Sequence, residues 1–152
     1  MILSASLFIK EEERMIKEII KDENILKQKS EHFIFGEDEY LISDLIDTAN
    51  EHRENCAGLA SIQLGVPKRI VVVKQGTKYI PFINPMIIQK SPKTYIATEG
   101  CLSLEGTRQV QRHASVKVVW RTASGQRKVQ MFNGFIAEVL QHEIDHCNGI
   151  LI

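Results

Sequence analysis

Residues 135–147 read FIAEVLQHEIDHC, and this stretch decides how the last part of the chain folds. Its apolar residues recur at helical spacing and predict an amphipathic helix, with Gly149 as the stop signal just beyond it. The helix contains an HExxH sequence, in which His142 and His146 lie one turn apart. Both imidazoles therefore project from one face of the helix, where they could share a metal ion.

Glu143 lies between these histidines in a position that suits proton transfer. Because it directly follows His142 in the sequence, its carboxylate cannot reach the same coordination position as the two imidazoles. It is placed to accept a proton from a water molecule that the metal would activate. A solvated polar helix face is the alternative interpretation of the same residues.

A third metal ligand is needed, because a catalytic metal commonly takes three protein ligands and leaves one position for water. Cys147 points around the helix from the shared face, so the third donor is expected upstream. The candidates are the carboxylates and His32, His52, His113, Cys56 and Cys101. Cys101 stands out because the neighbouring Gly100 permits a close backbone approach. A buried, small hydrophobic side chain explains Cys101 equally well.

Composition narrows the class of protein. The chain has 152 residues, of which 43% are hydrophobic and 25% charged, and its 19 basic residues balance 19 acidic ones. This predicts one packed globular domain over residues 1–152 and disfavours nucleic-acid binding. The three cysteines are an odd number in a chain without a recognisable signal peptide, which argues against a disulfide framework. No apolar run is long enough to span a membrane, so we expect a soluble, intracellular protein.

The fold class predicted from the hydrophobic patterning is α+β, a single domain of mixed, mostly antiparallel strands with a C-terminal helix that carries HExxH. Amphipathic helices are expected over residues 10–21 and 41–49, separated by an extended or irregular segment. Short strands are expected over residues 70–73, 79–83, 86–88 and 95–98, and a hairpin pairs residues 116–120 with 128–132.

Two motifs now resemble a known family. Glu99 to Ser103 reads EGCLS and Gln141 to His146 reads QHEIDH, which are similar to the second and third signature motifs of the peptide deformylases. The resemblance runs from about residue 56 to residue 150. The first family motif, GxGxAAxQ, is matched at Gly58, Ala60 and Gln63. Cys56 and Ser61 depart from it.

The resemblance implies a metal-dependent amidase that removes the formyl group from the N-terminal formyl-methionine of nascent peptides and releases formate. It implies Fe²⁺ as the metal, with Zn²⁺, Ni²⁺ or Co²⁺ as substitutes. The Cys-His₂ ligand set does not by itself choose among these metals. The implied residues are Cys101, His142 and His146 for the metal, Glu143 as general base, Gln63 and the Leu102 backbone N–H for the formyl oxygen, and Gly58, Glu138 and Val139 for the substrate.

The same resemblance implies formyl-methionyl nascent peptides and the ribosome as partners, in the cytoplasm. Glu99 is expected to support a ligand histidine, whereas Asp145 could do so or lie on a solvated face. Cys56 and Glu138 leave the side-chain preference open. Two other functions are considered: a deformylase-like protein that binds metal or formyl-peptide with little turnover, and an HExxH endopeptidase, in which EGCLS would have no role.

Overall fold

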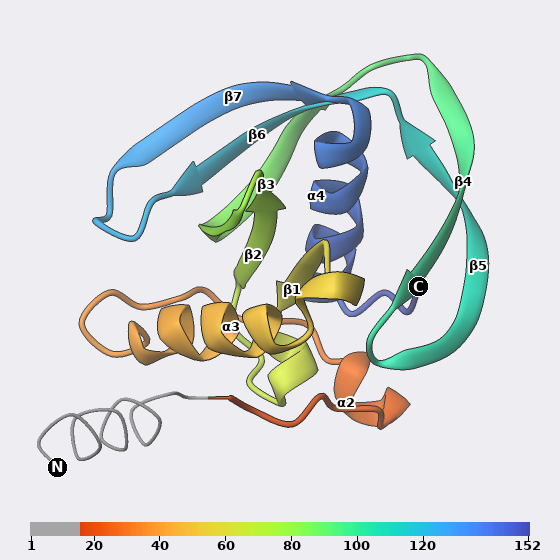
Figure 1. Ribbon diagram of the computed structural model, residues 1–152. Coiled ribbons are helices and arrows are strands. Elements are labelled where there is room, and N and C mark those ends of the chain that lie inside the picture. Colours follow the sequence, from red (N-terminus) through yellow and green to blue (C-terminus); the bar gives the residue numbers. More distant parts are fainter. Residues whose placement is uncertain (1–15) are drawn as a thin grey trace, which may run out of the picture.

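The computed structural model describes residues 16–152, which form three helices, two short 3₁₀ helices and seven strands (Figure 1). The helices are α2 (Glu23–Leu26), η1 (Arg53–Asn55), η2 (Ser61–Leu64), α3 (Tyr40–Glu51) and α4 (Gly134–Cys147). The strands are β1 (Gly58–Ala60), β2 (Ile70–Gln75), β3 (Lys78–Lys90), β4 (Thr94–Cys101), β5 (Leu104–His113), β6 (Ser115–Arg121) and β7 (Arg127–Asn133). None of these described helices is both long and apolar enough to cross a membrane.

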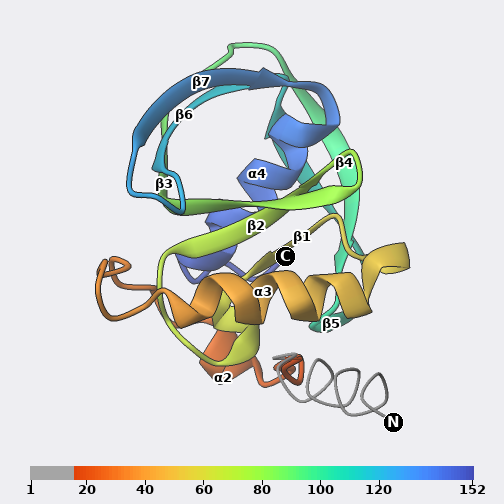
Figure 2. The same cartoon turned by 60° about the vertical axis from the view of Figure 1, so that its left-hand side comes forward.

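The strands form two antiparallel sheets on either side of α4. Five strands make a curved sheet in the order β1-β2-β3-β6-β7, and β4 pairs with β5 in a separate two-stranded ribbon. Figures 1 and 2 show α4 between the curved sheet and the ribbon, with α3 across the other face of the β1–β2 end. The ribbon therefore faces the helix that carries HExxH.

Strand β2 shows why the sheet is covered on both faces at this end. Val71 and Val73 belong to the core cluster that packs against α4, while Ile70 and Val72 belong to a second cluster against α3. Successive side chains of a strand point to opposite faces, so an uninterrupted β-branched run suits a strand buried on both sides. All four residues are fully buried.

Most predicted elements are confirmed, including the C-terminal helix, the helix near residues 41–49 and the hairpin formed by β6 and β7. The two strands expected over residues 79–83 and 86–88 form one strand, β3. Its pairing with β6 shifts between Ile83 and Met86, where Asn84 has a φ of 50°. The shift accommodates Pro85, which cannot donate a ladder hydrogen bond.

The helix expected over residues 10–21 is wrong in the part that the structure describes. Residues 10–15 lie outside the described range, and residues 16–21 form no helix. The backbone N–H of Lys17 donates to Thr48 Oγ1 at 2.9 Å, and that of Ile20 donates to the Gln63 carbonyl at 2.7 Å. Backbone donors that a helix would use internally instead attach this segment to α3 and η2.

Gly149 ends α4 as expected, and here the position requires glycine. Its φ is +75°, and a Cβ atom would lie 2.3 Å from the Lys27 carbonyl oxygen. The segment after α4 therefore passes against the end of α2 at a distance that only glycine allows.

Phe82 is the centre of the core between the sheet and α4. Its ring lies 4.7 Å from Trp120 and 5.9 Å from Phe132, and only 1% of the residue is exposed. We expect Phe82→Ala to lower the free energy of unfolding by about 3–5 kcal/mol, because it removes a buried ring and leaves a cavity. Met86→Ala, on the same strand but 54% exposed, is the control and should change it by only about 0.5 kcal/mol. Equal losses in urea denaturation would contradict this description of the core.

Candidate metal centre and substrate pocket

Three candidate metal ligands converge where α4 meets the end of β4. One ligand atom each from Cys101, His142 and His146 lies within 4.8 Å of the others, and the two Nε2 atoms are 3.2 Å apart. Among residues 16–152, this is the one cluster of three or more His, Cys, Asp or Glu side chains that could hold a metal ion. One thiolate and two imidazoles suit Zn²⁺ and Fe²⁺.

The electrostatics hold Cys101 and His146 in the forms that bind a metal. Although burial lowers the pKa of His142, its hydrogen bonds with Cys101 and Glu99 raise it to about 10, so a metal would displace a proton from this imidazole. Burial opposes ionisation of Cys101, but the hydrogen bond with His142 lowers the pKa of its thiol. Burial and the nearby His142 charge lower the pKa of His146 to about 3, so its imidazole is neutral. Within the described part of the chain, Nδ1 of His146 has no hydrogen-bond partner. A thiolate and a neutral imidazole are the forms that ligate a metal.

Glu99 supports His142 from the neighbouring strand. Its Oε1 lies 2.8 Å from Nδ1 of His142, and Arg112 donates to both of its carboxylate oxygens at 2.7 and 3.0 Å. Although burial alone would raise the pKa of Glu99, these hydrogen bonds from His142 and Arg112 lower it to about 2. A charged carboxylate on Nδ1 fixes the tautomer that presents Nε2 to the metal.

Arg112 also joins the ribbon to α4. Its third donor nitrogen, Nη1, contacts Asp145 Oδ2 at 2.6 Å, so Asp145 contributes to this network rather than lying free on a solvated face. Gln141 adds a second attachment, accepting from the His113 backbone N–H at 2.8 Å and donating to the His113 carbonyl at 2.9 Å. The helix is therefore held to β5 through two side chains.

Glu143 occupies a buried position beside the cluster. Burial raises the pKa of its carboxyl to about 7, and Oε1 has no hydrogen-bond partner among the described residues. A Cβ atom on Gly58 would lie 2.9 Å from Glu143 Oε2 and 2.9 Å from Val139 Cγ1. A side chain at position 58 would have to displace the Glu143 carboxylate and Val139, so glycine here lets β1 lie close to α4 while Glu143 keeps this position.

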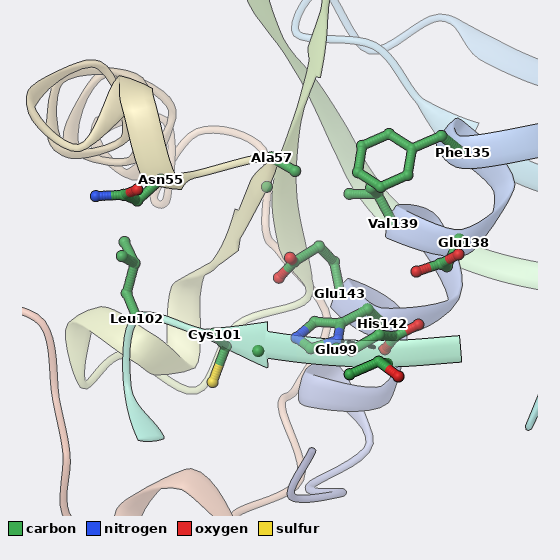
Figure 3. A pocket seen from close by; sticks show the side chains of 13 residues that line it. Asn55, Ala57, Glu99, Cys101, Leu102, Phe135, Glu138, Val139, His142 and Glu143 are labelled. Carbon is green, nitrogen blue, oxygen red and sulfur yellow. Dashed lines mark hydrogen bonds and ion pairs between the residues drawn. The ribbon is translucent and has the colours of Figure 1, made fainter. Parts of the chain in front are cut away.

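A pocket of about 240 Å³ opens beside these groups. Figure 3 shows Asn55 and Leu102 on one side and α4 on the other. The predicted substrate residues Gly58, Glu138 and Val139 all line it. The lining as a whole comprises Asn55, Ala57, Gly58, Thr98, Glu99, Gly100, Cys101, Leu102, Phe135, Glu138, Val139, His142 and Glu143.

Gln63 lies behind this lining, with 1% of its surface exposed. Its Oε1 accepts from the Ala60 backbone N–H at 3.0 Å, and its Nε2 donates to Ser103 Oγ at 3.1 Å. These two bonds fix the orientation of the amide and use one of its two N–H donors. Its predicted contact with the formyl oxygen stays a prediction.

Cys56, which departs from the family motif, does not alter the pocket wall. Its side chain is buried in the core cluster next to α3, and its carbonyl accepts a hydrogen bond from the Tyr79 hydroxyl. With a φ of −129°, its backbone is extended, a conformation that any residue can adopt and that does not require glycine.

Sequence reasoning missed several residues of the site. Arg112 is not among the predicted site residues, and the only sequence signal for it is that a buried carboxylate such as Glu99 needs a partner charge. Tyr95 was assigned to a strand only, yet its hydroxyl donates to Glu138 Oε1 at 2.9 Å. Asn55, Ala57 and Phe135 reach the pocket through the tertiary fold.

His113, a candidate ligand in the sequence, is half-buried, with Nδ1 2.8 Å from the Ser91 carbonyl, and is no ligand.

Comparisons with known proteins agree with this site. The family model described as polypeptide deformylase matches residues 16–152. A peptide deformylase of Clostridium beijerinckii is 45% identical over 138 residues, covering 91% of this chain and all of that protein. The crystal structure of an Acinetobacter baumannii class I type b peptide deformylase with bound Met-Ala-Ser has a TM-score of 0.80 and 29% identity, covering 91% of this chain and 96% of that one. An actinonin complex of a Synechococcus elongatus peptide deformylase has a TM-score of 0.80 and 27% identity, covering 91% of this chain and 77% of that one. On this evidence, the chain belongs to the polypeptide deformylase family.

Proposed function

We propose that this chain, with residues 1–152 as one domain, removes the formyl group from formyl-methionine at the N-terminus of nascent peptides and releases formate. The observation that carries the proposal is the convergence of Cys101, His142 and His146 within 4.8 Å, beside Glu143, whose Oε1 has no hydrogen-bond partner among residues 16–152. A buried base next to three metal donors and an open pocket suits metal-assisted hydrolysis of an amide.

Cys101, His142 and His146 would hold the metal, for which we propose Fe²⁺, with Zn²⁺, Ni²⁺ or Co²⁺ as substitutes. When bound, such an ion lowers the pKa of water and polarises a carbonyl oxygen. Glu99 keeps His142 in the tautomer that the ligand set needs, through its 2.8 Å contact with Nδ1. The soft thiolate and borderline imidazoles fit these ions better than they fit Mg²⁺ or Ca²⁺.

Glu143 takes the proton of the attacking water and delivers it to the departing nitrogen. Its pKa of about 7 suits both tasks near neutral pH, because the same group must first accept and then donate. Gln63 Nε2 and the Leu102 backbone N–H would donate to the formyl oxygen as negative charge develops on it. The bonds to Ala60 and Ser103 hold the Gln63 amide in one orientation for this role.

The substrate would lie in the pocket that residues of α4 and β1 both line. There Gly58 would face the peptide main chain, and Val139 and Glu138 would line the space for the methionine side chain. The Acinetobacter baumannii structure is described as bound to Met-Ala-Ser, a peptide with the same N-terminal residue.

The experiment that tests the function is formate release from formyl-Met-Ala-Ser. Cleavage of an internal peptide bond instead would support an endopeptidase, and binding without formate would support a non-catalytic deformylase-like protein.

Glu143→Gln tests the general base. Glutamine keeps the shape of the side chain but cannot accept the proton, so we expect kcat for formate release to fall by about 10²–10⁴-fold. Metal content, measured on the same protein, should stay at the wild-type level because no ligand is removed. Glu105→Gln, at an exposed position on β5, is the matched control and should keep wild-type activity. Loss of the metal in Glu143→Gln would assign Glu143 to structure instead.

Oxygen sensitivity tests the ligand and metal assignment. A thiolate on an open ferrous site is exposed to oxidants, and sulfinic or sulfonic acid at Cys101 would not be reversed by ordinary reductants. We therefore expect the Fe²⁺ protein to lose activity in air faster than the Zn²⁺ protein, since Zn²⁺ has no redox chemistry. Formate release and the mass of the Cys101 peptide would be followed together. Equal decay of both forms with unmodified Cys101 would remove the chemical support for iron.

A contact with the ribosome in the cytoplasm is the second part of the proposal. The chain is neutral overall, yet residues 55–133 contain twelve Lys and Arg residues and two acidic residues, Glu99 and Glu105. Arg127 and Lys128 are exposed on β7. We expect the protein to sediment with ribosomes at low salt and less so as salt rises, because phosphate contacts release counterions. Arg127→Glu with Lys128→Glu should weaken this association, and salt-independent sedimentation would contradict it.

A further inference from the structure

A second hollow lies next to the substrate pocket and has no role in the chemistry described so far. It measures about 570 Å³ and is lined by Lys17, Glu18, Ile19, Ile20, Lys21, Asp22, His52 and Leu102; we call it the outer hollow. Leu102 lines the substrate pocket as well. The two spaces therefore share a wall, and a chain leaving the pocket past Leu102 would arrive at the outer hollow.

Strand β1 determines where an extended peptide can pair. It stands at the end of the five-stranded sheet and pairs with β2 alone, so its other edge has no strand beside it within residues 16–152. Ala57 and Gly58, at the start of β1, line the substrate pocket. A peptide strand added at this edge would be recognised through its main chain, whatever its sequence.

The surroundings of β1 also determine the direction in which the peptide leaves. Beyond Ala60 the chain enters η2, where Ser61 and Gln63 are buried, so no extended peptide can continue that way. At the opposite end, Asn55 is exposed and lines the pocket across from α4 (Figure 3). His52 lies three residues before Asn55, at the end of α3, and lines the outer hollow.

The length of an extended peptide connects the two spaces. A strand advances about 3.3 Å per residue, so a tripeptide with its formyl group at the metal spans roughly 10 Å. Asn55, at the end of η1, lines the same pocket as Gly58, so such a peptide would extend from the metal toward Asn55. The next few residues of a longer peptide would then pass His52 and Leu102.

The lining of the outer hollow suits a peptide of any sequence. Lys17 and Lys21 are balanced by Glu18 and Asp22, so the hollow presents no excess of either charge. Ile19, Ile20 and Leu102 add half-buried apolar surface. Such a surface can contact an extended main chain and small apolar side chains without selecting for acidic or basic residues.

We propose that the outer hollow binds the part of the formylated peptide beyond its third residue, roughly residues four to six by strand length. This inference rests on the proposed deformylase function, because it assigns the downstream part of the same substrate. Contacts in the outer hollow strengthen binding of long peptides without touching the reacting atoms. Long peptides should therefore have a lower KM than short ones and the same kcat.

The test compares two substrates that differ only in length, formyl-Met-Ala-Ser amide and formyl-Met-Ala-Ser-Ala-Ser-Ala amide. We expect kcat/KM of the full chain to be about 10-fold higher for the hexapeptide, which corresponds to a modest gain in binding free energy. His52→Trp fills the outer hollow and should raise the KM of the hexapeptide. The ratio of kcat/KM for the hexapeptide to kcat/KM for the tripeptide should then fall to about 1. Glu18→Trp fills it from the opposite segment and should act in the same direction.

Ser43→Trp is the control, because Ser43 is exposed on α3 and lines neither space. It should keep the wild-type ratio of the two kcat/KM values. The proposal is overturned if the wild-type protein treats both peptides alike, or if His52→Trp and Glu18→Trp lower kcat/KM for both peptides by the same factor. Absence of formate from either peptide would overturn the proposed activity itself, and with it the substrate assigned to the outer hollow.

Discussion

The site depends on the buried contact of Arg112 with Glu99 and Asp145. These residues come from β5, β4 and α4, so one guanidinium ties the ribbon to the helix that carries the two histidines. Cys101 is on the ribbon and His142 is on the helix, so this contact, together with the Gln141 bonds to His113, holds their donor atoms close enough to share a metal. Removing the guanidinium would leave the buried Glu99 carboxylate with only its His142 contact among the bonds described above, which is more costly than losing a surface ion pair.

The two sides of the substrate pocket differ in the groups that they present. The α4 side supplies His142, Glu143 and Val139, all of them buried. The opposite side comes from Asn55, the open edge of β1 and Leu102, which offer mainly backbone and small or apolar groups. Buried side chains on one side and mainly backbone on the other suit an enzyme whose substrates share one N-terminal residue and differ beyond it.

The sequence predicted best those parts of the structure that depend on interactions between residues close together in the chain. The helix with HExxH was predictable because its apolar periodicity and the four-residue spacing of its two histidines are both local features of the sequence. Cys101 could be chosen only through family resemblance, since its distance from the histidines depends on how β4 packs against α4. The helix expected over residues 10–21 failed in its described part because Thr48 and Gln63 compete for its backbone donors. Arg112 received no role, because a strand arginine is ordinarily exposed and nothing local shows that this one is 4% exposed.

The most direct test of the account is X-ray absorption at the metal edge of the Zn²⁺-loaded protein, with formate release measured on the same sample. The account predicts one sulfur at about 2.3 Å and nitrogen ligands at about 2.0–2.1 Å. It also predicts that Cys101→Ser removes the sulfur and the activity, while Cys147→Ser, at a buried core position, keeps both. A metal without a sulfur ligand, or a sulfur that persists in Cys101→Ser, would contradict the assignment of Cys101, His142 and His146 as the metal centre.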